Sequence, residues 1–158
     1  MLELIREYLV ISDNSCTGLV WKKIPKNGRS EVGKPALTST DGPGYFYGRI
    51  LGQRVAAHRA VFALMHGYLP EQVDHINGVR KDNQPNNLRA GNVQVNQHNR
   101  IAKGYKLTLA GRYQARIYLD GKQVSLGSFA TKQEAQTAYL AAKRTYHPTA
   151  PERCYVIK

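Results

Sequence analysis

The segment that most constrains the fold is residues 71–100, where a long polar stretch lies between two short strand-like stretches and a helical pattern follows. The polar stretch is rich in Gly, Asp, Asn and Pro, which favour an irregular connection. The expected elements are a strand over 71–76, a connection over 77–86, a returning strand over 87–89 and a helix over 93–100 with Asn92 as its N-cap. This order predicts a compact ββα unit.

The residues before this unit predict small strands and one helix. Val61, Leu64 and Met65 lie at helical spacing before Gly67, which suits a C-terminal cap, so this helix should pack on the preceding hairpin. The expected elements are a helix or an arm over 1–10, a strand over 19–21, a loop over 22–44, a hairpin over 45–51 and 54–56 that turns at Gly52-Gln53, and the helix over 57–66.

The charge of the chain indicates a polyanionic partner. Its 158 residues include 23 Lys and Arg against 11 Asp and Glu, for a formal charge of +12. Nucleic acid is the first candidate, because Lys and Arg neutralise phosphates and release their counterions. A membrane surface is the rival, but the basic residues alternate with aromatic ones on short segments and do not follow one face of a long helix.

Other features of the composition suggest a cytoplasmic protein. Cys16 and Cys154 are far apart and form no Cys-x-x-Cys motif, so neither a zinc knuckle nor a disulfide framework is indicated. The sequence contains no run of about eighteen apolar residues. Glu3 and Glu7 make the N-terminus unlike a signal peptide. We therefore expect no membrane partner and a reducing compartment.

The C-terminal third predicts a second module with one basic face. Residues 102–158 hold ten basic and three acidic residues, a net +7. Residues 112–119 alternate, so that apolar side chains share one face and polar or basic side chains share the other. Asp120-Gly121 favours a two-residue hairpin turn, and Val124 and Leu126 continue the apolar face. Thr131 and Glu134 form a capping box for a following helix with small residues on one face.

The pair Asp74-His75 suggests phosphodiester cleavage at a metal site. This reaction needs an activated water and neutralisation of phosphoryl charge. Asp74 offers a hard oxygen ligand, Asn96 a carbonyl oxygen, and His75 an imidazole with a suitable pKa for a general base. Neighbours on a strand point to opposite faces, so Asp74 and His75 can divide metal and water between them if the strand bends at its end.

The same residues resemble the HNH endonuclease motif in the form carried by phage and intron homing endonucleases. The residues that carry this resemblance are Asp74-His75-Ile76-Asn77-Gly78, Asp82-Asn83, Asn87-Leu88-Arg89 and Asn96, with His58-Arg59-Ala60-Val61-Phe62 upstream. It implies an α+β fold with a ββα-metal (His-Me finger) core. It further implies His75 as the general base, Asn87 as the residue that ties the loop, and Asp74 and Asn96 as ligands of one Mg²⁺ or Mn²⁺.

Two positions of this resemblance carry alternatives. Asn96 stands where other branches of the family have a final His, which disfavours tight zinc binding, and it also fits an ordinary polar residue on a solvated helix face. His58 is expected to be a supporting residue that packs or hydrogen-bonds near the site, and the alternative for it is a catalytic role.

Residues 104–146 resemble the Apetala-type (ethylene-response-factor) DNA-binding domain. The residues that carry this resemblance are Gly104-Tyr105, Gly111 to Ile117, Asp120-Gly121-Lys122, Leu126 to Thr131, Glu134-Ala135 and Ala138-Tyr139. It implies a small three-stranded antiparallel sheet packed on one helix, with the sheet in the major groove of DNA. The contact candidates are Arg112, Gln114, Arg116, Lys122 and Gln123. Tyr118 is the nearest substitute for that domain's aromatic contacts, so its base code does not carry over.

We therefore expect a nuclease domain over 1–101 and a DNA-binding domain over 102–158. The expected function is a metal-dependent homing-type endonuclease that cuts double-stranded DNA one strand at a time, in a bacterial host cell if the chain is phage-encoded. We expect a monomer or weak dimer; a monomer should nick, and a double-strand break would need a dimer or two encounters. The alternatives are a non-catalytic DNA-binding regulator on a degenerate nuclease scaffold and an RNA-binding protein that uses the basic sheet.

Overall fold

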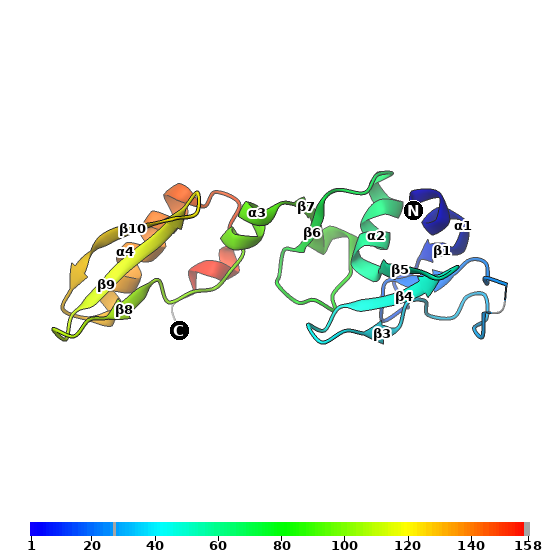
Figure 1. The fold of residues 1–158 in the computed structure, drawn as a ribbon, viewed down its shortest axis with the longest axis horizontal. Helices are drawn as coiled ribbons and strands as arrows, with labels where there is room; N and C mark the ends of the chain where they lie inside the picture. The colour runs from blue at the N-terminus through cyan, green and yellow to red at the C-terminus, as the bar shows by residue number, and fades with distance from the viewer. Residues whose placement is uncertain (27, 157–158) are drawn as a thin grey trace. The chain divides into compact units, whose positions relative to one another are not determined.

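The computed structural model describes residues 1–26 and 28–156 and divides into two compact units, Met1–Asn92 and Val93–Lys158 (Figure 1). This division falls before the domain boundary expected at residues 101 and 102. The mixed α+β class with small antiparallel sheets is confirmed. Among the described residues, no helix is long and apolar enough to cross a bilayer.

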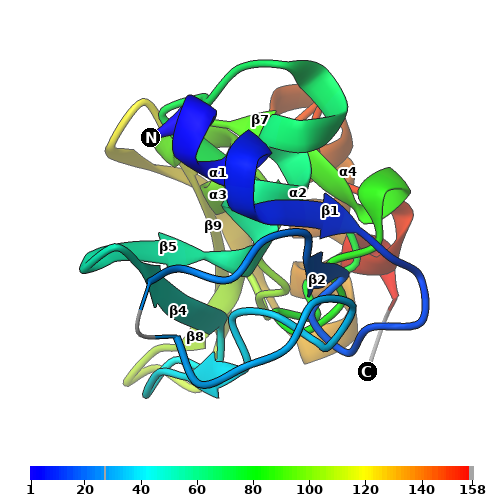
Figure 2. The ribbon, with the colours of Figure 1, turned by 90° about the vertical axis from the view of Figure 1, so that its right-hand side faces the viewer.

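The first unit is built around one buried helix. Its elements are α1 (Leu2–Tyr8), β1 (Leu9–Ile11), β2 (Leu19–Trp21), β3 (Ser39–Thr40), β4 (Phe46–Ile50), β5 (Gln53–Ala56), α2 (Ala57–His66), β6 (Gln72–His75), the 3-10 turn η1 (Pro85–Asn87) and β7 (Leu88–Gly91). Figure 2 faces α1 and β1, with β4 and β5 beyond them. Helix α2 buries Ala57, Ala60 and Val61 completely, because small side chains let the strands approach its backbone closely. The unit therefore holds one core, to which α1, α2 and every strand of the unit except β3 contribute residues.

Three details of the first unit differ from the expectation. The segment predicted as a loop contains the two-residue strand β3, which pairs with β4. The β4–β5 turn is formed by Leu51 and Gly52, since Gln53 already pairs with Ile50. Met65 is 53% exposed, so the core face of α2 is formed mainly by its small residues and Val61.

Strands β6 and β7 form an antiparallel hairpin that carries the motif residues. Asp74 pairs with Arg89 and His75 pairs with Leu88. The irregular connection predicted between them is present, and Asn87 ends the η1 turn before β7 begins at Leu88. Asn87 is therefore the last residue of the connection and not part of the returning strand.

The second unit contains a three-stranded sheet covered by a helix. Its elements are α3 (Val93–His98), β8 (Tyr105–Leu107), β9 (Tyr113–Leu119), β10 (Lys122–Phe129), α4 (Lys132–Tyr146) and the 3-10 turn η2 (Glu152–Tyr155). The strand order is β10-β9-β8, all antiparallel, and α4 packs on all three strands.

The local signals of the second unit behave largely as predicted. Asp120 and Gly121 both have positive φ, as a tight hairpin turn requires, and the Thr131 capping box is formed with Glu134. Val124 is an exception, because it is 40% exposed although it pairs with the buried Ile117.

Candidate functional site

His75 is held at the end of β6 by an asparagine from the following loop. The His75 Nε2 lies 3.0 Å from Asn83 Oδ1, and the Asn83 amide nitrogen donates to the Thr17 carbonyl over 3.0 Å. This second bond fixes which end of the Asn83 amide faces the ring, so Nε2–H donates to Oδ1. In the neutral ring Nδ1 is then the atom that can accept a proton.

Two rings pack against His75. The centroids of Tyr45 and His58 lie 5.8 and 5.2 Å from that of His75, and 5.0 Å from each other. Burial lowers the pKa of His75, against the raising effects of its bond to Asn83 and of nearby carboxylates. The ring is therefore neutral near pH 7, which is the state a general base needs.

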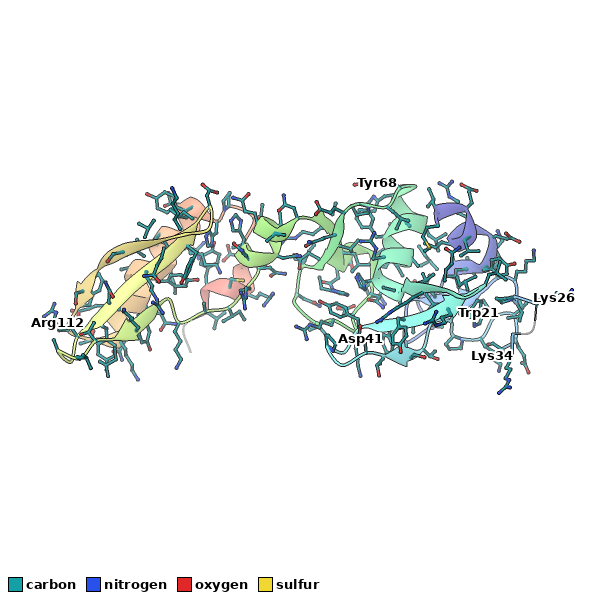
Figure 3. All side chains as sticks on the ribbon, viewed as in Figure 1. Trp21, Lys26, Lys34, Asp41, Tyr68 and Arg112 are labelled. Atoms are coloured by element: carbon teal, nitrogen blue, oxygen red, sulfur yellow. The ribbon has the colours of Figure 1, made fainter. Side chains whose placement is uncertain are left out.

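The pKa of His58 also lies below the ordinary value of a histidine. Burial lowers it from 6.5 to about 4, with further lowering by the neighbouring His75 and Arg59 and an opposing effect of Asp41. Asp41 also accepts a hydrogen bond from the Tyr45 backbone amide and forms an ion pair with Arg54 of β5. Figure 3 labels Asp41 beside the β4–β5 hairpin. His58 thus lies beside the candidate base as a neutral packed ring.

Asn87 joins the two ends of the connection between β6 and β7. Its Oδ1 accepts from the Asn77 backbone at 2.9 Å, and its Nδ2 donates to Asn77 Oδ1 at 3.0 Å and to the Asp82 carbonyl at 2.7 Å. These bonds satisfy a side chain that is only 8% exposed. The contacts position the loop and place Asn87 away from a direct chemical role.

The same loop is attached to the segment before β4. Arg80 donates to the Pro43 carbonyl at 2.6 Å and its guanidinium lies over the Tyr45 ring, 5.3 Å from the centroid. Lys81 lies 5.7 Å from the Phe46 ring centroid. Two basic side chains of the loop are therefore engaged within the first unit.

Asp74 forms an ion pair across the hairpin. Arg89 Nε and Nη2 donate to its Oδ2 at 3.0 and 2.8 Å, and the Asp74 side chain is 12% exposed. Burial alternates along β6, so Asp74 and His75 lie on opposite faces of the strand. A metal ion on Asp74 would compete with the Arg89 guanidinium for the same carboxylate.

The second predicted ligand, Asn96, lies on α3 in the other unit. Among the described residues, no group of three or more His, Cys, Asp or Glu could hold a metal ion. An Asp and an Asn both offer oxygen, which suits Mg²⁺. The pair Asp74 and Asn96 stays a prediction.

The predicted DNA contacts lie on the sheet of the second unit. Gln123 Oε1 accepts from Arg116 Nη1 at 3.0 Å and from the Tyr118 hydroxyl at 3.1 Å, which groups these three exposed or half-buried side chains. Arg112, labelled in Figure 3, donates to the Ser128 carbonyl at 2.7 Å. Gln114 pairs with Ser128 on one side and Lys106 on the other, and Lys122 begins β10 and is exposed.

Three residues that hold His75 in place could not be assigned that role from the sequence. The motif includes Asn83 but gives it no role, and no sequence pattern marks Thr17 or Tyr45. Thr17 is fully buried and its hydroxyl donates to the Ala36 carbonyl at 2.7 Å, so the carbonyl that holds Asn83 is itself fixed. A contact over 66 positions of sequence leaves no local signal.

Comparison with known proteins supports the motif assignment. No curated protein and no solved structure matches the chain. Residues 55–98 match the model of a family described as HNH endonuclease, and the matched stretch contains Asp74, His75, Asn87 and Asn96. The match supports an HNH nuclease that acts on DNA.

Proposed function

We propose that the chain is a metal-dependent endonuclease that hydrolyses phosphodiester bonds of duplex DNA with His75 as its general base. The observation that carries the proposal is the chain of hydrogen bonds from His75 to Asn83, both in the matched family region, and from Asn83 to the Thr17 carbonyl outside it. It holds a neutral imidazole with Nδ1 as the proton acceptor, which is what activation of a water requires.

The chemistry divides between four side chains. His75 takes a proton from the attacking water at Nδ1, while Asn87 keeps the connecting loop in place. Asp74 and Asn96 would hold Mg²⁺ or Mn²⁺, which when bound neutralises phosphoryl charge and stabilises the departing 3′ oxygen. The products are a 5′-phosphate and a 3′-hydroxyl. One such site per chain cuts one strand at a time, so a monomer nicks, and a double-strand break needs a dimer or two encounters.

The second unit supplies affinity for the duplex. Residues 102–158 carry a net +7, and their sheet presents Arg116, Gln123 and Tyr118 opposite the face covered by α4. This arrangement fits the Apetala-type domain, whose sheet lies in the major groove. Together with the motif it favours the homing type of phage or mobile-element nuclease.

A plasmid assay tests the nuclease proposal. We expect Mg²⁺-dependent conversion of supercoiled DNA to the nicked form, and a loss of about 10² to 10⁴-fold in rate for His75→Ala. His66→Ala is the matched control, because His66 is exposed on α2. If His75→Ala cuts as fast as the parent, the assignment of the base is wrong.

The ion pair between Arg89 and Asp74 favours a second candidate, a DNA-binding regulator on a non-catalytic scaffold. Such a protein binds the same duplex in the presence of Mg²⁺ and leaves it intact. Competition between duplex DNA and structured RNA at a fixed salt concentration separates both candidates from an RNA-binding protein, which would prefer the RNA.

A further inference from the structure

A cleft of about 680 Å³ lies in the second unit between residues 97–105, strand β9 and α4. It opens because the chain leaves the sheet before β8. The Arg116 amide donates to the Gly104 carbonyl at 2.8 Å, but two residues further along β9 the Tyr118 carbonyl accepts from His147 Nε2 at 3.0 Å instead. The edge of β9 beyond Arg116 therefore faces a space and not another strand.

Gly104 makes this departure sharp. Its φ is +73°, and a Cβ there would lie 1.9 Å from the Tyr139 ring. Only glycine can therefore turn the backbone directly over that ring. Tyr139 forms the floor of the cleft as a buried side chain of α4.

The wall opposite β9 is held in place by the C-terminal part of the unit. Lys143 Nζ donates to the Arg100 carbonyl at 2.7 Å, although the Lys143 residue is only 1% exposed. Arg153 donates to the Asn99 carbonyl at 2.8 Å, and the Cys154 thiol lies 3.4 Å from the same oxygen. The backbone that carries Arg100 is therefore fixed before any ligand arrives, which reduces the entropic cost of binding.

The lining of the cleft is basic and aromatic. Arg100, Lys103 and Arg116 contribute cations, and Tyr105 and Tyr118 contribute exposed or half-buried rings. Among the described residues that line it there is no carboxylate.

The acidic residues of the unit lie elsewhere. Glu134 is engaged in the capping box, Glu152 pairs with Arg144, and Asp120 forms the β9–β10 turn outside the lining of the cleft. The cleft therefore presents uncompensated positive charge beside aromatic surface.

We infer that this cleft binds one nucleoside monophosphate unit, either free or within a single strand of DNA. Its volume falls in the range of small-molecule sites, roughly 300 to 1,000 Å³. Arg100, Lys103 and Arg116 receive the phosphate, and the base stacks on a tyrosine, as unpaired bases do on aromatic side chains. A paired base in a duplex offers no open face, so the base that stacks here is unpaired, although Arg116 and Tyr118 also belong to the sheet surface proposed to meet the duplex. The site does not depend on the proposed nuclease activity.

Equilibrium binding to the full chain in EDTA tests the site without cleavage. The probes are thymidine 5′-monophosphate, inorganic phosphate and a five-residue thymidine oligonucleotide. The test variant is Arg100→Gln with Lys103→Gln, and the matched control is Lys34→Gln with Lys132→Gln, which removes two exposed charges outside the cleft.

We expect the test variant to weaken binding of the monophosphate by about tenfold or more, as loss of charge-assisted hydrogen bonds implies, and the control to leave it within about twofold. Tyr118→Ala should weaken binding of the monophosphate and leave binding of inorganic phosphate unchanged. Tighter binding of the oligonucleotide than of the monophosphate identifies the strand as the source, and equal binding identifies the free nucleotide. Equal binding of phosphate and monophosphate, or equal binding by both double variants, would overturn the inference.

A measurement on the unaltered chain makes the result independent of variant folding. Photo-crosslinking with 4-thiothymidine 5′-monophosphate, followed by mass spectrometry, should label Tyr105, Tyr118 or Tyr139. Labelling confined to residues outside the cleft would contradict the site.

Discussion

The buried His58 ring makes the stability of the first unit depend on pH. Its pKa falls from 6.5 in an open environment to about 4 in the fold. Between these values the unfolded chain binds more protons than the folded one. The stabilisation is therefore complete above pH 6.5 and is lost as the pH falls toward 4.

The size of this effect follows from the two pKa values. The full shift corresponds to about 3 kcal/mol, and the part lost between pH 7 and pH 5 is about 2 kcal/mol. His75, whose pKa burial also lowers, acts in the same direction. A change of at least this size is therefore expected in the free energy of unfolding of the metal-free protein.

Urea denaturation at pH 7, 6 and 5, followed by Trp21 fluorescence, measures this change in the free energy of unfolding. Trp21 is the single tryptophan of the chain and packs against the core of the first unit, so its signal reports that unit alone. His58→Phe should remove the larger share of the pH dependence, while His66→Gln on the same helix should leave it unchanged. An undiminished pH dependence in His58→Phe would refute the reasoning.

Three further changes test other parts of the structure. Asn87→Ala removes three side-chain hydrogen bonds and should cost the first unit about 3 kcal/mol by urea denaturation followed at Trp21; a loss below about 1 kcal/mol would mean that the loop is held by other contacts. Arg89→Gln removes the cation on Asp74 and should tighten Mn²⁺ binding measured by calorimetry, whereas unchanged affinity would count against Asp74 as a ligand. Thr131→Ala removes the N-cap of α4 and should lower the stability of the second unit by about 1 kcal/mol. Thermal unfolding followed by far-UV circular dichroism should then show a lower midpoint temperature, and an unchanged midpoint would show that the cap is dispensable.

The sequence allowed prediction of elements whose ends carry their own signals. Gly67, the Asp120-Gly121 turn and the Thr131 box each fixed a boundary that the structure repeats. Turn and cap residues act through their own backbone, so they can be recognised without knowledge of the neighbours.

Side-chain environments were harder to predict. His98 is a polar residue at the end of the short helix α3, yet it is 7% exposed and stacks on His147, a residue distant in sequence, with 4.2 Å between the ring centroids. Met65 has the spacing of a core residue and is exposed. Periodicity indicates that residues share a face, but the neighbour that covers each position of that face is set by tertiary packing.

The bond from Asn83 to Thr17 has a consequence for how this site can be moved or shortened. An excised peptide of residues 55–98 would contain every residue predicted to take part in cleavage, namely Asp74, His75, Asn87 and Asn96. It would lack the Thr17 carbonyl that orients Asn83, the Pro43 carbonyl that holds Arg80, and the Tyr45 ring. The residues that identify the motif thus form a shorter segment than the residues that hold its side chains in position. A segment transferred to another protein with its site intact must begin at or before residue 17.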